Sequence, residues 1–332
     1  MLMLVVFDLL LKGLTMIKTI ACDDGSTGIK LAVCSDGNVK SVRISNRAIY
    51  GRAAAFGHEP DIYSCESSVY TFDENADAIP TSNISYQYST QASCAIQHAL
   101  LTSNFVKPKE EVNLVVTLPI AEFFDADNRP DINKINAKKN MVMRKVTPEK
   151  YEPVIIKDVK VMPEGIPAAL NSLRDEKGQA LHSDIDLVLI ADIGGTTLDL
   201  CLMRGIATSI VKVGSYSTGM VEVHKNRQKL LGYDNLPPAH TDRVLQGIDT
   251  CDKIEQAIEP VVNKAMGEIN DFISSYPLDH IVCVGAGADK LAKKINEYRL
   301  TTYSHVKSIT VAKNAEFALA EAIVQIEEAK NE

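Results

Sequence analysis

The chain carries the same short polar turn twice, and this repeat constrains the fold more than any other feature of the sequence. The first copy spans residues 23–27 (DDGST) and the second spans residues 192–197 (DIGGTT). Each copy follows an apolar run and precedes a segment of alternating residues, which is typical of a half-buried strand. The copies align without gaps from 23/192 to 33/202. Together they predict a duplicated strand–turn–strand unit, and hence two lobes.

The residue types in these turns are suited to binding a phosphate chain. Glycine lets backbone N–H groups approach phosphate closely, and the neighbouring hydroxyls add donors. Asp23 and Asp192, at the heads of the two turns, can hold a hydrated Mg²⁺. One such turn alone is typical of an ordinary hairpin, since Asp-Gly is a favoured hairpin dipeptide. The prediction of a phosphate site therefore depends on the pair. The G-x-x-x-x-G-K-[ST] loop does not occur in the chain.

Composition and charge exclude several classes of protein. The 332 residues are enough for two domains and a large core. The net charge of −8 argues against non-specific DNA binding, which depends on Lys and Arg neutralising phosphates. Any action on DNA is therefore expected to require a basic partner. The seven cysteines include no C-x-x-C pair, which favours a reducing cytoplasm over a disulfide framework.

Residues 1–15 form an apolar extension ahead of Met16. The segment is too short and too interrupted to span a bilayer, and it lacks the features of a signal peptide. One interpretation is a helix lying on a membrane surface. The favoured interpretation is that translation begins at Met16, which places the first strand at the N-terminus.

Hydrophobic periodicity predicts the elements between and after the two turns. Short apolar runs indicate buried strands at 112–118, 154–161 and 281–284, and helical patterns are expected over 91–103, 168–174, 221–231, 241–251, 252–274, 289–297 and 314–328. His98 lies in the first of these helices and is expected to be structural or solvent-facing. Residues 131–146 are rich in lysine and predict a solvated basic face, with a contact to a partner as the alternative.

A third glycine-containing element follows the buried strand at 281–284. Gly285-Ala286-Gly287 leads from that strand into the helix at 289–297. Such a turn lets a base and ribose lie against backbone near a helix N-terminus. Taken alone it is also typical of simple strand-to-helix punctuation. Its position after both phosphate turns favours a nucleotide site.

The order of these elements resembles the actin/Hsp70/sugar-kinase superfamily: first turn, residues 163–167 (PEGIP), second turn, then Gly-Ala-Gly. Within it, five segments closely resemble the ParM (StbA) family of plasmid-segregating bacterial actins, and these are 81–88 (TSNISYQY), 98–103 (HALLTS), 117–119 (TLP), 156–164 (IKDVKVMPE) and 193–199 (IGGTTLD). The resemblance is strongest over residues 17–202. The chain departs from the family at Ala286, where a glycine is usual, and over residues 225–255.

This resemblance implies an α/β, actin-like, two-lobed ATPase fold. Two ribonuclease H-like domains would be duplicated, with a nucleotide cleft between them. Lobe I would span residues 16–183, with a C-terminal helix at 309–332 packing back onto it. Lobe II would span residues 184–308, and residues 1–15 would be an extension.

The resemblance also implies roles for individual residues. Asp23 and Asp192 would hold Mg²⁺, mainly through waters, and Glu164 would act with Asp192 in catalysis by polarising the attacking water. The alternative for Glu164 is a charge favoured by a helix N-terminus. The nucleotide would be held by Asp24, Gly25, Ser26, Thr27, Lys30, Gly194, Gly195, Thr196, Thr197, Gly285, Ala286 and Gly287. For Lys30, an outward-facing strand lysine is the alternative.

The function implied is an ATPase that polymerises into dynamic filaments and segregates plasmid DNA. Its cofactors would be Mg²⁺ and ATP, with GTP as the alternative nucleotide. It would work in the cytoplasm through a ParR-like DNA-binding adaptor, without touching nucleic acid or membrane itself. The alternatives are a small-molecule kinase of the same superfamily, a chaperone ATPase and a membrane-associated filament.

Overall fold

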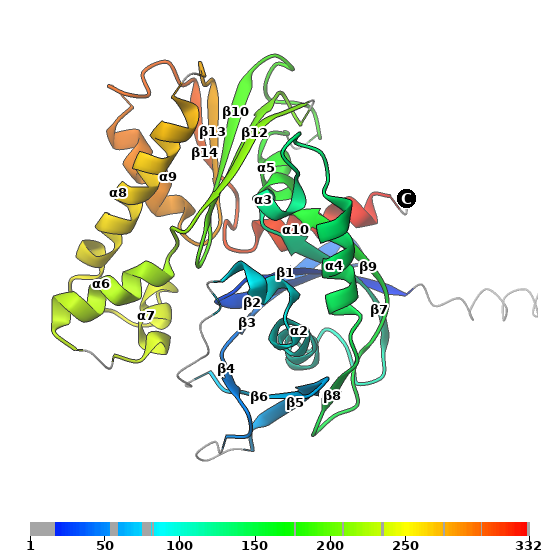
Figure 1. Ribbon diagram of the computed structural model, residues 1–332. Coiled ribbons are helices and arrows are strands. Elements are labelled where there is room, and N and C mark those ends of the chain that lie inside the picture. Colours follow the sequence, from blue (N-terminus) through cyan, green and yellow to red (C-terminus); the bar gives the residue numbers. More distant parts are fainter. Residues whose placement is uncertain are drawn as a thin grey trace, which may run out of the picture.

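The computed structural model describes residues 17–53, 59–74, 81, 83–175, 177–207, 209–233, 236–274, 276–299 and 301–330. These residues form two lobes, each built on a five-stranded sheet (Figure 1). The predicted extension at 1–15 lies outside the described residues, so both interpretations of it stay open. No helix in the described ranges is long and apolar enough to cross a membrane. All seven cysteines are free thiols.

The two sheets have the same strand order and directions. The sheet of the first lobe contains, from edge to edge, β3 (Asn38–Ser45), β2 (Gly28–Ser35), β1 (Lys18–Asp24), β7 (Glu111–Leu118) and β9 (Ile155–Pro163). The sheet of the second lobe contains β12 (Ser209–Tyr216), β11 (Leu198–Arg204), β10 (Leu187–Ile193), β13 (His280–Val284) and β14 (Ser308–Val311). In each sheet the first three strands are antiparallel and the last three are parallel. The duplication predicted from the repeated turn is therefore confirmed.

The central strands are apolar throughout because both faces of each sheet are covered. Along β10, Leu189 and Ala191 face the core of the second lobe, whereas Val188 and Ile190 face a core between the two sheets. A strand buried on both faces reads as a continuous apolar run, which is how this segment appears in the sequence.

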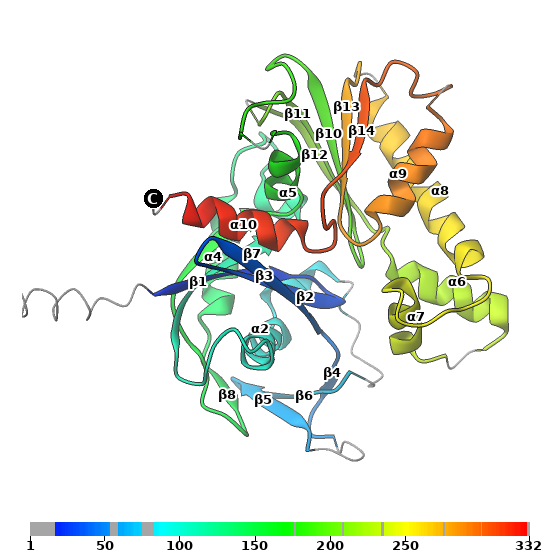
Figure 2. The ribbon, with the colours of Figure 1, turned by 180° about the vertical axis from the view of Figure 1, so that it is seen from behind.

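Two helices fill the space between the sheets. Figure 2 shows α5 (Ile166–Ser172) and α10 (Ala318–Glu328) in this middle layer. Ala169 and Ile323 are completely buried there, in the same apolar cluster as residues of both sheets. Helix α10 packs on β1 and β2. The lobe boundary expected at 308/309 falls inside β14, which pairs with β13 in the second sheet.

The remaining elements cover the outer faces. The first lobe adds a four-stranded sheet and four helical segments: β4 (Ala48–Tyr50), β6 (Ser68–Phe72), β5 (Asp61–Cys65), β8 (Val146–Pro148), η1 (Ile84–Tyr88), α2 (Thr90–Thr102), α3 (Ile120–Phe123) and α4 (Ile132–Val142). The second lobe adds α6 (Val221–Leu231), α7 (Pro238–Leu245), α8 (Ile254–Ile273) and α9 (Ala288–Glu297). The predicted helices all occur, although α7 starts and ends earlier than expected and α10 begins later, after a turn.

His98 is a structural residue of the first lobe. It lies on α2, stacks on Phe72 at 4.6 Å between ring centroids and is 3.3 Å from Tyr63 Oη. Burial lowers the pKa of His98 from 6.5 to about 4. The folded protein therefore holds this imidazole neutral where the unfolded chain takes up a proton. The contribution of His98 to the free energy of unfolding is therefore fully present above pH 6.5, the pKa in the unfolded chain. It is lost as the pH falls from 6.5 to about 4.

Replacing His98 with Gln is expected to flatten the acid side of the stability profile. The fall in the pKa of His98 from 6.5 to about 4 corresponds to on the order of 3 kcal/mol of unfolding free energy. Urea unfolding at pH 7, 5.5 and 4.5 measures this slope, and the difference between wild type and variant isolates His98 from the carboxylates. His305→Gln, an exposed histidine, serves as the control. Parallel profiles for wild type and His98→Gln would contradict the assignment.

Candidate nucleotide site

A cavity of about 370 Å³ lies between the lobes, where the β1–β2 and β10–β11 turns face each other. The two turns touch directly, since Ser26 Oγ lies 2.8 Å from Thr196 Oγ1. The cavity is lined by residues of both lobes: Asp23, Gly25, Ser26, Thr27, Lys30, Thr81, Asn83, Ile84, Tyr86, Gln87, Pro119, Ala121, Glu122, Glu164, Asp192, Gly194, Gly195, Thr196, Thr197, Ser215, Tyr216, Ser217, Val284, Gly285, Ala286, Ala315, Glu316 and Leu319. Most of the residues predicted from the two turns are therefore brought together.

The close approach of the turns requires glycine at position 195. A Cβ there would lie 2.3 Å from Thr27 Oγ1, which is closer than any side chain tolerates. The second turn is closed by a hydrogen bond from Gly194 N to Thr197 O at 2.9 Å. Its backbone is also anchored from outside, because Met220 N donates to Gly194 O at 3.0 Å just before α6 begins. These backbone hydrogen bonds hold the turn in place, and Gly194 to Thr197 line the cavity.

Four of the carboxyl groups at this cavity form one cluster. Asp23, Glu164 and Asp192 line the cavity, and Asp199 is buried behind them. Burial, followed by repulsion from Asp199 and Asp23, raises the pKa of Asp192 to about 7. Burial and the same carboxylates also raise the pKa of Glu164 well above its usual range. The cluster therefore favours the binding of positive charge.

The donor set fits a magnesium ion. Carboxylate oxygens are the hard ligands that Mg²⁺ prefers, and it is usually held by one or two of them together with waters and substrate phosphates. Lys30 supplies part of the positive charge that the carboxyl cluster favours, because its Nζ lies 3.1 Å from Asp23 Oδ2. One lysine against four clustered carboxyl groups leaves an excess of negative charge that a divalent cation would offset.

Glu164 reaches the cavity because of the residues that flank it. β9 ends at Pro163, and Glu164 N donates to Leu118 O at 2.9 Å. Gly165 has a φ of +73°, a conformation that glycine adopts without strain. A Cβ on Gly165 would lie 3.3 Å from Asp192 Cβ, so the Pro-Glu-Gly turn passes directly beside Asp192. Glu164 also precedes α5, so the helix-terminus interpretation of its charge stays open.

The Gly-Ala-Gly segment contributes two residues to the cavity. Gly285 has a φ of +85°, and a Cβ there would lie 2.4 Å from Asp192 Oδ1. Position 285 must therefore be a glycine to lie this close to Asp192. Ala286 also lines the cavity. Gly287 does not line it. Its N–H donates to Ile193 O at 3.1 Å, and a Cβ would meet Ile193 and Met220. Gly287 therefore allows the start of α9 to pack closely against the end of β10.

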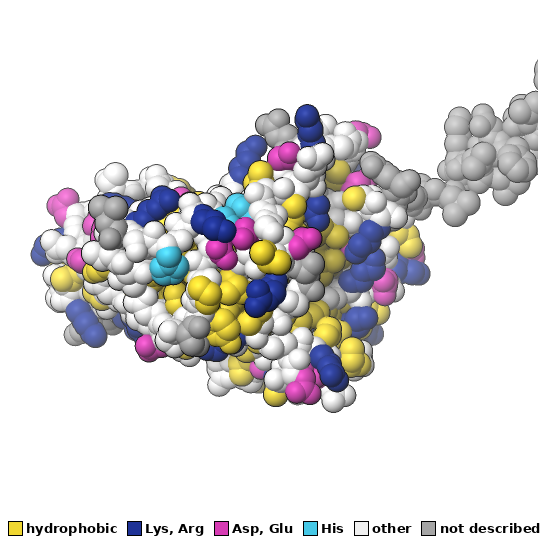
Figure 3. All heavy atoms as spheres, turned by 90° about the horizontal axis from the view of Figure 1, so that it is seen from above, with side chains coloured by type: hydrophobic (Ala, Val, Ile, Leu, Met, Phe, Trp, Pro, Cys, Tyr) yellow, Lys and Arg dark blue, Asp and Glu magenta, His cyan; other side chains and the backbone are white. Residues whose placement is uncertain are grey.

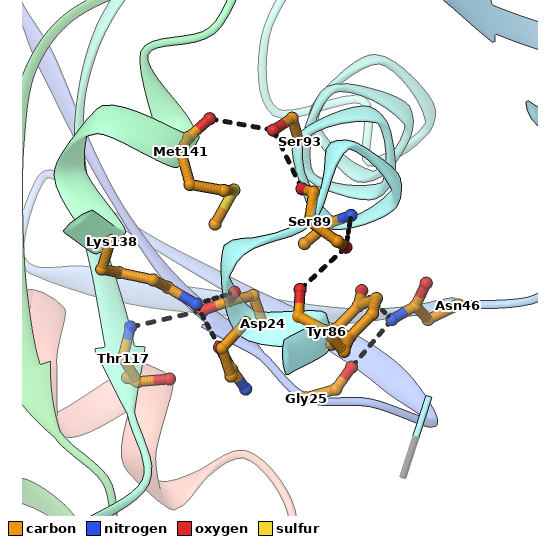
Figure 4. Close-up of polar contacts among 11 residues, drawn as sticks. Asp24, Gly25, Asn46, Tyr86, Ser89, Ser93, Thr117, Lys138 and Met141 are labelled. Atoms are coloured by element: carbon orange, nitrogen blue, oxygen red, sulfur yellow. Dashed lines mark hydrogen bonds and ion pairs between the residues drawn. The ribbon is translucent and has the colours of Figure 1, made fainter. Parts of the chain in front are cut away.

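Asp24 also lies outside the cavity, although the sequence predicted that it binds nucleotide. It is buried and forms an ion pair with Lys138, whose Nζ lies 2.5 Å from Asp24 Oδ2 (Figure 4). Gln87 accepts a second hydrogen bond from Lys138. Thr117 N lies 3.4 Å from Asp24 Oδ1. The Asp24 side chain therefore holds the end of β1 against α4, directly behind the β1–β2 turn.

The expectation of a solvated basic face over residues 131–146 is wrong for Lys138. Its side chain is completely buried, because α4 packs against η1 and β9 with this residue facing inward. Lysine is almost never buried without a partner, and here Asp24 is the partner. The other lysines of the segment include Lys134, which reaches Glu122 at the cavity rim at 3.0 Å.

Sequence reasoning missed several residues around the cavity. The most informative is Asp199, which accepts hydrogen bonds from Ser215 Oγ and, at 3.3 Å, from Ile120 N of the other lobe. Asp199 lies opposite Asp192 in the β10–β11 pair, as Lys30 lies opposite Asp23 in the β1–β2 pair. The gapless alignment of the two turns could have identified it. Thr81 and Asn83 lie in segment 81–88, which resembles the ParM family but was given no role in the site, whereas Glu122, Tyr216 and Glu316 carried no comparable local signal.

Comparison with known proteins supports the resemblance drawn from the sequence. The family model described as "Plasmid segregation protein ParM, N-terminal" matches residues 18–175, so the predicted ParM resemblance is confirmed for the first lobe. No curated protein matches the sequence.

Solved structures match over nearly the whole chain, at low sequence identity. The apo ParM protein of pSK41 covers 95% of this chain and 98% of its own, with 16% identity and a TM-score of 0.59. The archaeal actin homologue Ta0583 in complex with ADP covers 95% of this chain and 100% of its own, with 16% identity and a TM-score of 0.67. The AlfA filament structure from a B. subtilis plasmid covers 93% and 98%, with 14% identity and a TM-score of 0.57. The fold of this chain is therefore actin-like.

Proposed function

We propose, from the ParM-type first lobe and the actin-like fold of the whole chain, that this protein is a filament-forming nucleoside triphosphatase. The observation that carries the proposal is the cavity itself. Two glycine- and hydroxyl-rich turns, one from each lobe, meet across it beside a cluster of carboxylates. A ligand held by both turns would join the lobes, so its phosphates would control how the lobes close.

The phosphates would lie between the turns, on the backbone and hydroxyl groups of Gly25, Ser26, Thr27, Gly194, Gly195, Thr196 and Thr197. Lys30 would neutralise part of their charge. The base and ribose would lie against Gly285 and Ala286, and the nucleotide would be ATP, with GTP as the alternative. Asp23 and Asp192 would hold Mg²⁺, mainly through waters. When bound, the ion would offset phosphate charge and orient the phosphate chain.

Glu164 would act on the attacking water. A carboxylate whose pKa is raised by burial and by neighbouring acids is a better proton acceptor near neutral pH than an ordinary glutamate. Deprotonation of Glu164 is favoured once positive charge offsets the surrounding carboxylates. The side chain could then orient a water and accept its proton as the water attacks the terminal phosphate.

The state of the bound nucleotide, before or after hydrolysis, would determine whether the subunits assemble into a filament. The AlfA match is described as a filament, and head-to-tail contacts between identical subunits generate open filaments. In our proposal nucleotide binding closes the lobes and favours these contacts, and hydrolysis weakens them. The filament would segregate plasmid DNA in the cytoplasm through a basic, ParR-like adaptor, which the net charge of −8 would attract.

Light scattering tests this proposal. The purified chain is expected to scatter transiently after addition of ATP and Mg²⁺, and to give a low, flat trace with ADP or without nucleotide. Phosphate release is measured in parallel. ATP turnover with a flat trace at all protein concentrations would contradict assembly and favour the small-molecule kinase.

Asp192→Asn is expected to lose most of the Mg²⁺-dependent turnover, because Asn keeps the shape but removes the charge that holds the ion. Phosphate release at increasing Mg²⁺ measures the shift in metal requirement. Asp184→Asn, an exposed residue shortly before the same strand, controls for a general effect of removing a carboxylate from this segment. Unchanged Mg²⁺ dependence in Asp192→Asn would remove this residue from the metal site.

A further inference from the structure

A cluster of metal-ligating side chains lies at the end of the second lobe that is remote from the cavity. His182 and Asp186 precede β10, and His280 is the first residue of β13. One potential ligand atom from each of the three lies within 4.8 Å of the other two, and no second group of this kind occurs among the described residues. Figure 3 shows this end of the molecule, where histidine, acidic and basic side chains lie beside one another.

The chemistry of the cluster differs from that of the nucleotide cavity. Two imidazoles and one carboxylate suit Zn²⁺ and similar transition metals, whereas Mg²⁺ prefers oxygen ligands alone. Zinc ligand atoms lie about 2.0–2.1 Å from the ion, which places neighbouring ligands roughly 3.3 Å apart at a tetrahedral angle. His280 Nε2 and Asp186 Oδ2 already lie 3.2 Å apart.

Outer contacts orient two of the three ligands. Without a metal, Nε2–H of His280 donates to Asp186 Oδ2, and Nδ1 pairs with Ser308 Oγ at 2.8 Å. On metal binding the ring would take the Nδ1–H form, which donates to Ser308 and leaves Nε2 to the ion. Lys307 Nζ holds Asp186 Oδ1 at 3.0 Å, so the other oxygen, Oδ2, faces His280. The backbone N–H of Ser183 also donates to Oδ2, at 3.2 Å. Ligating histidines and carboxylates are commonly fixed by outer contacts of this kind.

The third ligand is adjustable. The ring of His182 stacks on that of His280 with 3.6 Å between centroids and 23° between planes. The nitrogen lone pairs of stacked rings do not converge, so His182 must turn out of the stack to complete a site. It can do so because it is only half-buried, on the loop that links α5 to β10.

We propose that His182, Asp186 and His280 form a binding site for one zinc-class divalent ion, with water as a fourth ligand. The ion would tie the loop between the lobes to the start of β13, and so stabilise the second lobe. The site is separate from the nucleotide cavity, because Asp186 immediately precedes β10 and Asp192 lies near its other end. Six residues of extended chain correspond to roughly 20 Å.

Titration of the full-length, metal-free protein with Co²⁺ or Zn²⁺ tests the proposal. Saturating Mg²⁺ is present to occupy the nucleotide cavity, and a reductant keeps the thiols free. We expect one equivalent of Co²⁺ to bind with a visible absorption band that Zn²⁺ removes, and Zn²⁺ to raise Tm. His182→Ala is expected to weaken binding by more than about 100-fold, and Ser308→Ala by about 10- to 100-fold, the range found for outer-contact losses.

Two controls make the result decisive. His305→Ala removes an exposed histidine outside the cluster and should leave affinity unchanged. His182→Ala should retain wild-type Tm without metal and wild-type nucleotide hydrolysis, since His182 is half-buried and remote from the cavity. Absence of a stoichiometric Co²⁺ band in the wild type would overturn the proposal. Equal affinity in wild type and His182→Ala would overturn it too, because the cluster would then not be the ligand set.

Discussion

Glu164→Gln is expected to slow phosphate release by about 10²–10⁴-fold, the usual contribution of a positioned general base. Gln keeps the size and one acceptor oxygen of the side chain but cannot take the proton of the attacking water. Nucleotide binding is expected to persist, because the groups proposed to hold phosphate belong to the two turns. Filaments formed with ATP should therefore live longer than those of the wild type. Phosphate release and light scattering on the same sample measure both effects.

The matched control is Glu122→Gln. Glu122 lines the same cavity, but its oxygens accept from Tyr88 Oη at 2.8 Å and from Lys134 Nζ at 3.0 Å. Its carboxylate is thus engaged at the rim, and hydrolysis should change far less than in Glu164→Gln. Wild-type phosphate release from Glu164→Gln would assign Glu164 to the helix terminus of α5. Equal losses in both variants would indicate a general disturbance of the cavity.

The parts of the fold and site that could be predicted from sequence are those encoded over short stretches. The β1–β2 and β10–β11 hairpins were predicted because alternation and turn residues are local signals. The cavity followed from the repeat, since two equivalent hairpins in duplicated lobes can face each other. Asp199 was accessible to the same reasoning, through its alignment with Lys30, and was overlooked.

Other features could not be predicted because they depend on contacts between distant segments. Asp24 belongs to the first turn by sequence, yet its side chain faces Lys138, 114 residues later. A lysine within a basic segment carries no local sign that it is buried. Gly287 likewise resembles Gly285, but only the packing of Ile193 and Met220 separates its role from that of a cavity residue.

Lys138→Met is expected to lower the free energy of unfolding by about 3–5 kcal/mol, the usual cost of removing one partner from a buried ion pair. Asp24 would be left with its charge buried, and its remaining hydrogen bond within the described part of the chain would be the N–H of Thr117, at 3.4 Å. The double variant Asp24→Asn/Lys138→Met should recover most of the loss, because it contains no unpaired charge at this position. Urea unfolding of the wild type, both single variants and the double variant gives the coupling energy between the two residues.

The control for Lys138→Met is Lys139→Met, the next residue of α4, which is only half-buried and should shift stability by about 0.5 kcal/mol or less. Equal losses in the two lysine variants would show that α4 is sensitive to any substitution and would argue against the ion pair. Because Asp24 immediately precedes Gly25, Lys138→Met should also weaken the rise in Tm produced by ATP and Mg²⁺. The double variant should restore that rise together with stability, since the first turn needs a fixed backbone behind it rather than a charge.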